Sequence, residues 1–198
     1  MSADKFNELK RELSEKHINV SDEWLQSTIN SFGISANINV NHIYRKWLNS
    51  DLRMNICDHI CCDHFSSNAF DLSLARREIH GFHCVQLISV ENSSAPLIDE
   101  YNAFLELDDD KNEDLYSQTT EKEVEEFRAK SKVKGPRLLS FILTNGKCEF
   151  KAIEYKPIDF LNDSLPIGLK LLLKGPLEIQ MGIMFLTCQN VEILGGKV

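Results

Sequence analysis

Apolar residues spaced three and four positions apart predict three helices at the start of the chain. In the second pattern, Ser21 is placed to cap the helix and Gly33 to end it. The third pattern runs over residues 40–52 and carries a tryptophan on its apolar face. The first pattern is the stripe formed by Phe6, Leu9, Leu13 and His17. These helices predict a compact bundle over residues 1–54.

From residue 81 onward the hydrophobic period changes to two, which is typical of strands. Asn145 and Gly146 separate two apolar runs, and this pair is a strong signal for a hairpin. The predicted strands cover 82–90, 137–144, 147–155, 169–175 and 182–187, and "VEILGG" closes the chain. We therefore expect an α+β protein. Its helical bundle is followed by a connector over 55–80 and by a five-stranded Greek-key barrel of the OB type over 81–198.

The strand over 147–155 predicts an outward-facing apolar position. If Phe150 and Ala152 point into the barrel, alternation leaves Ile153 on the outer face among charged residues. A single exposed apolar residue is ordinary, but exposed apolar neighbours would indicate a docking patch.

A long acidic segment, residues 91–136, separates the first two predicted strands. It holds thirteen acidic and six basic residues, so it accounts for −7 of the net charge of −8. Its first part carries apolar residues at spacings of three and four, a pattern that predicts an amphipathic turn able to order against a partner. The alternative is that this turn folds back onto the barrel. Either way, the length exceeds that of an ordinary connection and predicts an inserted loop.

The composition of the 198 residues narrows the class of protein. A hydrophobic content of 42% is sufficient for a core. No apolar run approaches the roughly 18 residues that a membrane span requires. The N-terminus has no stretch typical of a signal peptide, so we expect a cytosolic or nuclear protein without membrane contact. Outside the acidic segment the chain is nearly neutral and lacks the basic footprint of an autonomous nucleic-acid binder.

Several stretches resemble a known family. "WLQSTI" and "IYRKWLNSDLR" are similar to paired helical motifs at the N-terminus of the RecQ-mediated genome instability protein 1 family. "HGFHCVQLISV", "PRLLSFILTNGKCEFKAIEYKPI", "DSLPIGLKLLLKG" and "NVEILGGKV" continue the resemblance in the same order. The resemblance implies a non-catalytic OB-fold subunit without a cofactor. Such a subunit works in the nucleus with topoisomerase III and a Bloom-type RecQ helicase to dissolve double Holliday junctions.

The resemblance also implies where the partner is contacted. The barrel docks on the topoisomerase, the alpha paralogue being favoured over beta, while the loop between the first two strands reaches the DNA gate. Contact with DNA is then weak or indirect. The docking positions fall on Ile153, Lys170 and Ile183. The apolar residues of the insertion that would meet the partner are Leu97, Ile98, Tyr101 and Phe104. A related alternative is Tudor domain-containing protein 3, a partner of topoisomerase III beta whose insertion is shorter.

Clustered cysteines and histidines raise the alternative of a zinc site. Two pairs could approximate the layout of a structural zinc site, one pair from "CDHICCDH" and one from the start of the first strand. The strand pattern, however, accounts for Cys84 as a small apolar filler, and the family that the chain resembles holds no metal there. The candidate ligands are Cys57, Cys61, Cys62, His64, His80, His83 and Cys84.

Two further alternatives are a single-strand-binding barrel and an enzyme. Phe141, Phe150 and Tyr155 are the aromatic residues on which bases could stack, with lysines at 147, 151 and 156 nearby. Each aromatic also has an ordinary role in a core. No motif of a nucleophile elbow, phosphate-binding loop or zinc protease is present, and the acidic run 108–110 lies in the long loop. We therefore expect no catalysis.

Overall fold

A computed structural model describes residues 3–32, 38–54, 56, 70–71, 73, 75–94 and 137–198. The chain divides into two compact units, Met1–Glu91 with Leu139–Val198, and Asn92–Leu138. The fold and the site discussed below belong to the first unit. The predicted insertion and its residues Leu97, Ile98, Tyr101 and Phe104 lie outside the described residues. They stay predictions.

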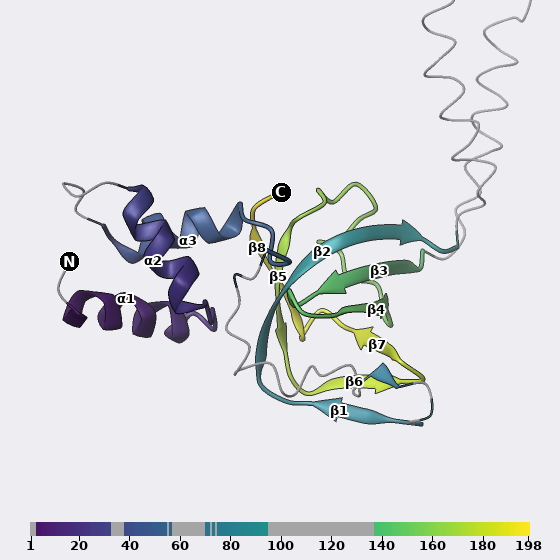
Figure 1. The fold of residues 1–198 in the computed structure, drawn as a ribbon. Helices are drawn as coiled ribbons and strands as arrows, with labels where there is room; N and C mark the ends of the chain where they lie inside the picture. Colours follow the sequence, from purple (N-terminus) through teal and green to yellow (C-terminus); the bar gives the residue numbers. More distant parts are fainter. Residues whose placement is uncertain are drawn as a thin grey trace, which may run out of the picture. The chain divides into compact units, whose positions relative to one another are not determined.

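The predicted helical bundle is present (Figure 1), with α1 at Ala3–Glu15, α2 at Asp22–Ser31 and α3 at Val40–Leu48. The side-chain oxygen of Ser21 accepts a hydrogen bond from the Trp24 amide at 3.3 Å, so the predicted cap of α2 is confirmed. The prediction that His17 continues the first helix is wrong. His17 lies beyond α1 and has a φ of 61°, outside the helical region. Among the helices described, none is long and apolar enough to cross a bilayer.

The described residues form eight strands rather than the five predicted. The five predicted strands are all present, and the closing segment forms a strand as well. The two strands that were missed are short, and both are held by pairing: β1 with β6, and β6 also with β7. The strands are β1 (Arg77–Ile79), β2 (Phe82–Asn92), β3 (Leu139–Thr144), β4 (Glu149–Glu154), β5 (Lys170–Lys174), β6 (Leu177–Gln180), β7 (Ile183–Leu186) and β8 (Val191–Gly195).

The strands make one mixed sheet in the order β1-β6-β7-β4-β3-β2-β5-β8. β3 and β4 pair antiparallel through the predicted Asn-Gly hairpin, whereas β4 and β7 run parallel. In the parallel pair Ile153 lies opposite Phe185, and Lys151 lies opposite Ile183. This parallel pairing brings two distant segments of sequence onto one surface.

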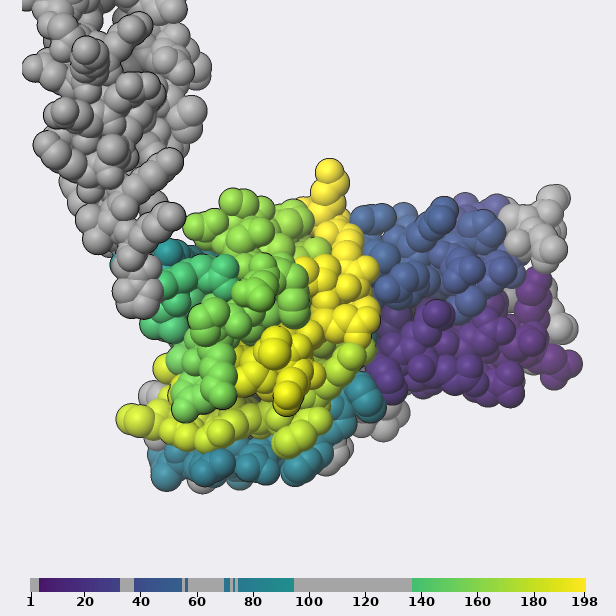
Figure 2. All heavy atoms as spheres, turned by 180° about the vertical axis from the view of Figure 1, so that it is seen from behind, coloured from purple at the N-terminus to yellow at the C-terminus, as the bar shows by residue number. Residues whose placement is uncertain are grey.

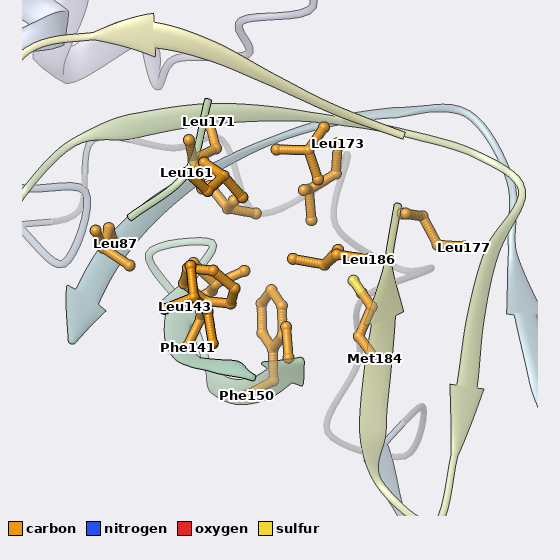
Figure 3. Close-up of a cluster of buried hydrophobic side chains, with 14 of the residues drawn as sticks. Leu87, Phe141, Leu143, Phe150, Leu161, Leu171, Leu173, Leu177, Met184 and Leu186 are labelled. Carbon is orange, nitrogen blue, oxygen red and sulfur yellow. The ribbon is translucent and has the colours of Figure 1, made fainter. Parts of the chain in front are cut away.

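The sheet curves around a hydrophobic core into which side chains from both its halves point (Figure 3). Phe141 and Phe150 are both buried in this core. The ring of Phe70 stacks on that of Phe150 with centroids 4.6 Å apart. The side chains labelled in the close-up are Leu87, Phe141, Leu143, Phe150, Leu161, Leu171, Leu173, Leu177, Met184 and Leu186.

β2 has two packed faces. Val85 and Leu87 enter the core of the sheet, whereas Cys84 packs against the core of the bundle. The Cys84 thiol donates a hydrogen bond to the His17 carbonyl at 3.3 Å. The side chains of this strand therefore alternate between two faces, as predicted. The helical bundle packs on the face that carries Cys84.

The bundle and the C-terminal strand also pack together. Leu194 of β8 packs against the core of the bundle, and Figure 2 shows the blue segment of α3 against the yellow C-terminal segment. A Cβ atom on Gly196 would lie 2.1 Å from the carbonyl oxygen of Leu48. Only a glycine fits here, because the backbones approach directly. Helices and sheet thus share an interface made partly of main chain.

Candidate protein-docking face

One side of the sheet carries a strip of apolar side chains that are not fully buried. Alternation along β4 points Phe150 and Ala152 inward, which leaves Ile153 on the opposite surface, half-buried. The same alternation in β7 buries Met184 and turns its neighbours outward. We define the outer face as Ile142, Ile153, Tyr155, Ile183 and Phe185.

The parallel register sets the geometry of the outer face. Ile153 lies directly opposite Phe185. Ile183 is two residues before Phe185 on β7, so it is on the same side of that strand. The predicted docking residues Ile153 and Ile183 are therefore on one surface of two neighbouring strands. Tyr155 is 63% exposed, and its ring meets that of Phe185 edge to face with centroids 5.5 Å apart. Aromatic anchors of this kind are enriched at protein interfaces.

Lys170 is not on the outer face. It lies opposite Gln86 in the β2–β5 pair, on the side that the bundle covers, and it is fully buried. Its Nζ donates a hydrogen bond to the carbonyl oxygen of Gly168 at 3.0 Å. A buried ammonium requires such partners, since desolvation of an unpaired charge is costly. Of the three docking positions suggested by resemblance, this structure thus places two together and the lysine elsewhere.

Charge beside the outer face is mixed, because Glu149 and Lys151 are both exposed and lie on the same side of β4 as Ile153. Lys151 and Lys156 are exposed and make no ion pair within the part of the chain that the structure describes. Glu178, opposite Phe185, is paired with Arg76 through Nε at 3.1 Å and also accepts a hydrogen bond from Gln180. The acid is thereby neutralised while the two lysines are not. The apolar strip therefore has a margin of mixed charge on its β4 side, where the exposed Glu149 precedes Lys151 by two residues.

Sequence reasoning missed Phe185 as a surface residue. The sequence does indicate that Tyr155 shares a face with Ile153, because the two residues are two positions apart in one extended segment. No local signal places Phe185 beside Ile153, since the β4–β7 pairing joins segments about thirty residues apart. The aromatic contact of Tyr155 with Phe185 follows only from that pairing.

Base stacking has little support in the geometry. Phe141 and Phe150 are buried in the core and therefore present no ring to a nucleic acid. Tyr155 is the one exposed ring of the three candidates.

Of the candidate zinc ligands, the structure describes His80, His83 and Cys84, and these three do not form a metal site. The Nε2 of His83 lies 2.9 Å from the His80 carbonyl oxygen, and the Cys84 thiol is bonded to the His17 carbonyl. Where side chains are described, no group of three or more histidine, cysteine or acidic residues could hold a metal. The other candidates, Cys57, Cys61, Cys62 and His64, lie outside the described residues.

Two family models match the chain. "RMI1, N-terminal helical domain" matches residues 13–54, and "RMI1, N-terminal OB-fold domain" matches residues 61–198. Curated relatives named RecQ-mediated genome instability protein 1 are also similar. The Xenopus laevis protein is 30% identical over 201 residues, which cover 94% of this chain and 32% of the relative. The Danio rerio protein is 30% identical over 193 residues, which cover 93% and 34%. The chain thus spans about a third of the length of these relatives.

Proposed function

Because the chain belongs to the RecQ-mediated genome instability protein 1 family, we propose that it is a non-catalytic OB-fold subunit that docks on topoisomerase III. In this proposal it acts in the nucleus with a Bloom-type RecQ helicase, during dissolution of double Holliday junctions and decatenation. The alpha paralogue of the topoisomerase is the favoured partner. The outer face of the sheet makes the contact.

The observation that carries the proposal is the shared surface of Ile153, Ile183 and the Tyr155–Phe185 aromatic pair. A protein interface is typically centred on a few apolar and aromatic anchors, surrounded by polar residues that exclude water. The outer face has this composition. Its anchors come from two adjacent strands of a rigid sheet, so little conformational entropy is lost on binding.

The second part of the proposal concerns the acidic segment 91–136. We infer that the strands of the sheet close as an OB barrel and that this segment is the inserted loop between its first two strands. Its thirteen acidic residues would contact basic residues of the topoisomerase gate. Such contacts change the balance of open and closed gates only if they differ in strength between the two states. The loop then regulates DNA passage without performing chemistry.

The docking face is tested by measuring the affinity of the chain for purified topoisomerase III alpha and beta. Ile153→Asp should weaken binding at least about 30-fold, as expected for an anchor at the centre of an interface. Ile167→Asp is the matched control, because Ile167 is 62% exposed but lies outside the outer face. Thermal unfolding of both variants shows whether the fold is retained. Equal affinity of Ile153→Asp and the wild type would refute the docking face.

The role of the loop is tested separately by deleting residues 97–130. We expect complex formation to persist and decatenation by the topoisomerase to change. Loss of complex formation would show that anchor and regulator are not separate. Stronger binding to the beta paralogue than to alpha would favour the Tudor domain-containing protein 3-like alternative.

A further inference from the structure

The turn between β3 and β4 contains a pair of residues that is prone to deamidation. Asn145 is followed by Gly146, the sole Asn-Gly pair of the sequence. Figure 1 shows the two strands that this turn joins side by side. Asparagine is a thermolabile residue, and a following glycine has no side chain to hinder attack by its amide nitrogen. The same pair that predicts the hairpin is therefore also a candidate site of covalent modification.

Deamidation of this pair is an intramolecular reaction in which water is the only other reactant. The main-chain nitrogen of Gly146 gives up its proton and bonds Cγ of Asn145. The bond from Cγ to Nδ2 breaks, and the amino group leaves with that proton as ammonia. Water then opens either carbonyl of the cyclic succinimide. The product is aspartate or isoaspartate, and in isoaspartate the main chain runs through Cβ and Cγ.

The folded turn holds the attacking nitrogen. The Gly146 amide donates a hydrogen bond to Oγ1 of Thr144 at 3.0 Å. Thr144 is buried, and its hydroxyl donates to the Cys148 carbonyl oxygen at 2.9 Å, which fixes the acceptor in place. The proton that must leave the nitrogen is thus bonded to a buried oxygen rather than to water.

The side chain under attack is held as well. Oδ1 of Asn145 accepts hydrogen bonds from the amides of Lys147 and Cys148, both at 2.9 Å, as in an Asx turn. Nδ2 has no hydrogen-bond partner among the residues described, so the side chain is held through Oδ1. Asn145 is buried, so moving Cγ onto the nitrogen would strain two bonds that water does not readily replace.

The main chain of the turn packs directly on the segment that follows α3. A Cβ atom added to Gly146 would lie 2.5 Å from the carbonyl oxygen of Leu52. The amide of Leu52 donates a hydrogen bond to the Gln86 side chain. The turn therefore belongs to the interface between bundle and sheet, and its peptide groups are not free to rotate while that interface is closed.

We propose that Asn145 is a deamidation site that the fold protects and that it reacts only when the β3–β4 turn opens. The rate then follows the population of the open turn, as for other reactions of locally unfolded segments. Isoaspartate lengthens the main chain between residues 145 and 146, so the turn no longer fits against Leu52. A brief opening is thereby converted into permanent damage at the interface between bundle and sheet.

The test follows deamidation of Asn145 by peptide mapping with mass spectrometry, in the folded 198-residue chain and in the same chain unfolded in urea. We expect the reaction to be at least about 10-fold slower in the folded chain. A methyltransferase that recognises isoaspartate identifies the product. Equal rates in the two states would overturn the proposed protection.

Thr144→Val tests the hydrogen bond to the attacking nitrogen, because valine has a similar shape but no acceptor. It should accelerate deamidation of the folded chain about 3- to 10-fold. Thr28→Val is the matched control, since Thr28 is a buried threonine of α2 outside the turn. An unchanged rate in Thr144→Val, or an equal acceleration in Thr28→Val, would overturn the role of Thr144.

The consequence is tested with chain that has been deamidated in urea and refolded. Ion exchange separates modified from unmodified chains of the same preparation, because the modification adds a negative charge. We expect the isoaspartate form to melt at least about 5 °C below the unmodified form. Equal melting temperatures would overturn the predicted damage at the interface. These measurements use no partner protein, so their outcome is independent of the proposed function.

Discussion

The side chain of Gln86 in β2 binds the main chain of Leu52, thirty-four positions earlier, across the interface between sheet and bundle. Its Oε1 accepts a hydrogen bond from the Leu52 amide at 2.8 Å, and its Nε2 donates one to the Asp51 carboxylate at 3.0 Å. Gln86 is buried, so its bond with the Leu52 amide is shielded from water, and its bond with Asp51 is partly shielded. One amide side chain therefore satisfies polar groups in the turn that follows α3.

Replacing Gln86 by leucine should destabilise the protein by about 2 to 3 kcal/mol, because the buried Leu52 amide loses its acceptor. Urea denaturation measures this change. Gln26→Leu is the control, since Gln26 is an exposed residue of α2 whose amide bonds the exposed side chain of Asn30. A loss below about 0.5 kcal/mol in Gln86→Leu would contradict the importance of this bridge.

The Asp51 carboxylate should make stability depend on pH in the acid range. Hydrogen bonds from the Arg53 side chain lower the pKa of Asp51 to about 2, and Gln86 contributes a further bond. An aspartate in the unfolded chain titrates near ~4. Because the folded-state pKa is depressed, the stabilisation is present above about pH 4 and is lost as the pH falls toward 2.

The expected contribution is about 1 kcal/mol, since the Arg53 partner is half exposed and solvent screens the pair. Unfolding free energies of the wild type and Asp51→Asn, measured between pH 2 and 6, check it. The variant keeps an oxygen acceptor but should lack this part of the pH dependence. Arg53→Met should lose only part of it, because the amide of residue 53 and the Gln86 side chain still bond the Asp51 carboxylate. A slope identical to that of the wild type in both variants would contradict the assignment.

The close approach of Gly196 to Leu48 predicts a large effect of a single methyl group. Gly196→Ala would place Cβ 2.1 Å from the Leu48 carbonyl oxygen and would also hold alanine at a φ of 83°. The neighbouring Gly195 is a matched control, because its φ is 100° but no atom lies within 4 Å of a Cβ added there. Gly195→Ala thus measures the backbone strain alone.

We expect Gly195→Ala to cost about 1 to 2 kcal/mol and Gly196→Ala at least about 2 kcal/mol more, because backbone atoms must move apart. Thermal unfolding of the two variants measures the difference. Equal melting temperatures would show that the helix end and the C-terminal segment are not held in this direct contact.

The aromatic pair of the outer face should matter for binding more than for folding. Tyr155 is exposed, so Tyr155→Ala should change the free energy of unfolding by less than about 1 kcal/mol. The same change should weaken binding to topoisomerase III alpha by about 10- to 30-fold if the ring is an anchor of the interface. Calorimetric titration and thermal unfolding of one preparation test both statements. A large loss of stability with normal affinity would make the ring a purely structural element.

Hydrophobic period was sufficient to predict the three helices and five of the strands, because it depends only on neighbouring positions in the chain. The cap at Ser21 and the turn at Asn145 were local signals of the same kind. β1 and β6 span three and four residues, too few for alternation to be detected. They are held by pairing, β1 with β6 and β6 also with β7. His17 fitted a helical stripe by spacing, yet it lies beyond the helix and stacks on Phe82.

The sequence by itself thus determined the three helices, the longer strands and the outward position of Ile153, since a residue's face within a strand follows from its immediate neighbours. Only the tertiary structure decided that Phe185 and Ile183 lie beside it and that Lys170 is buried. It also decided that Gln86 bonds the end of the bundle. Strand order and burial arise from contacts between distant segments, and no periodicity within one segment encodes which other segment will cover it.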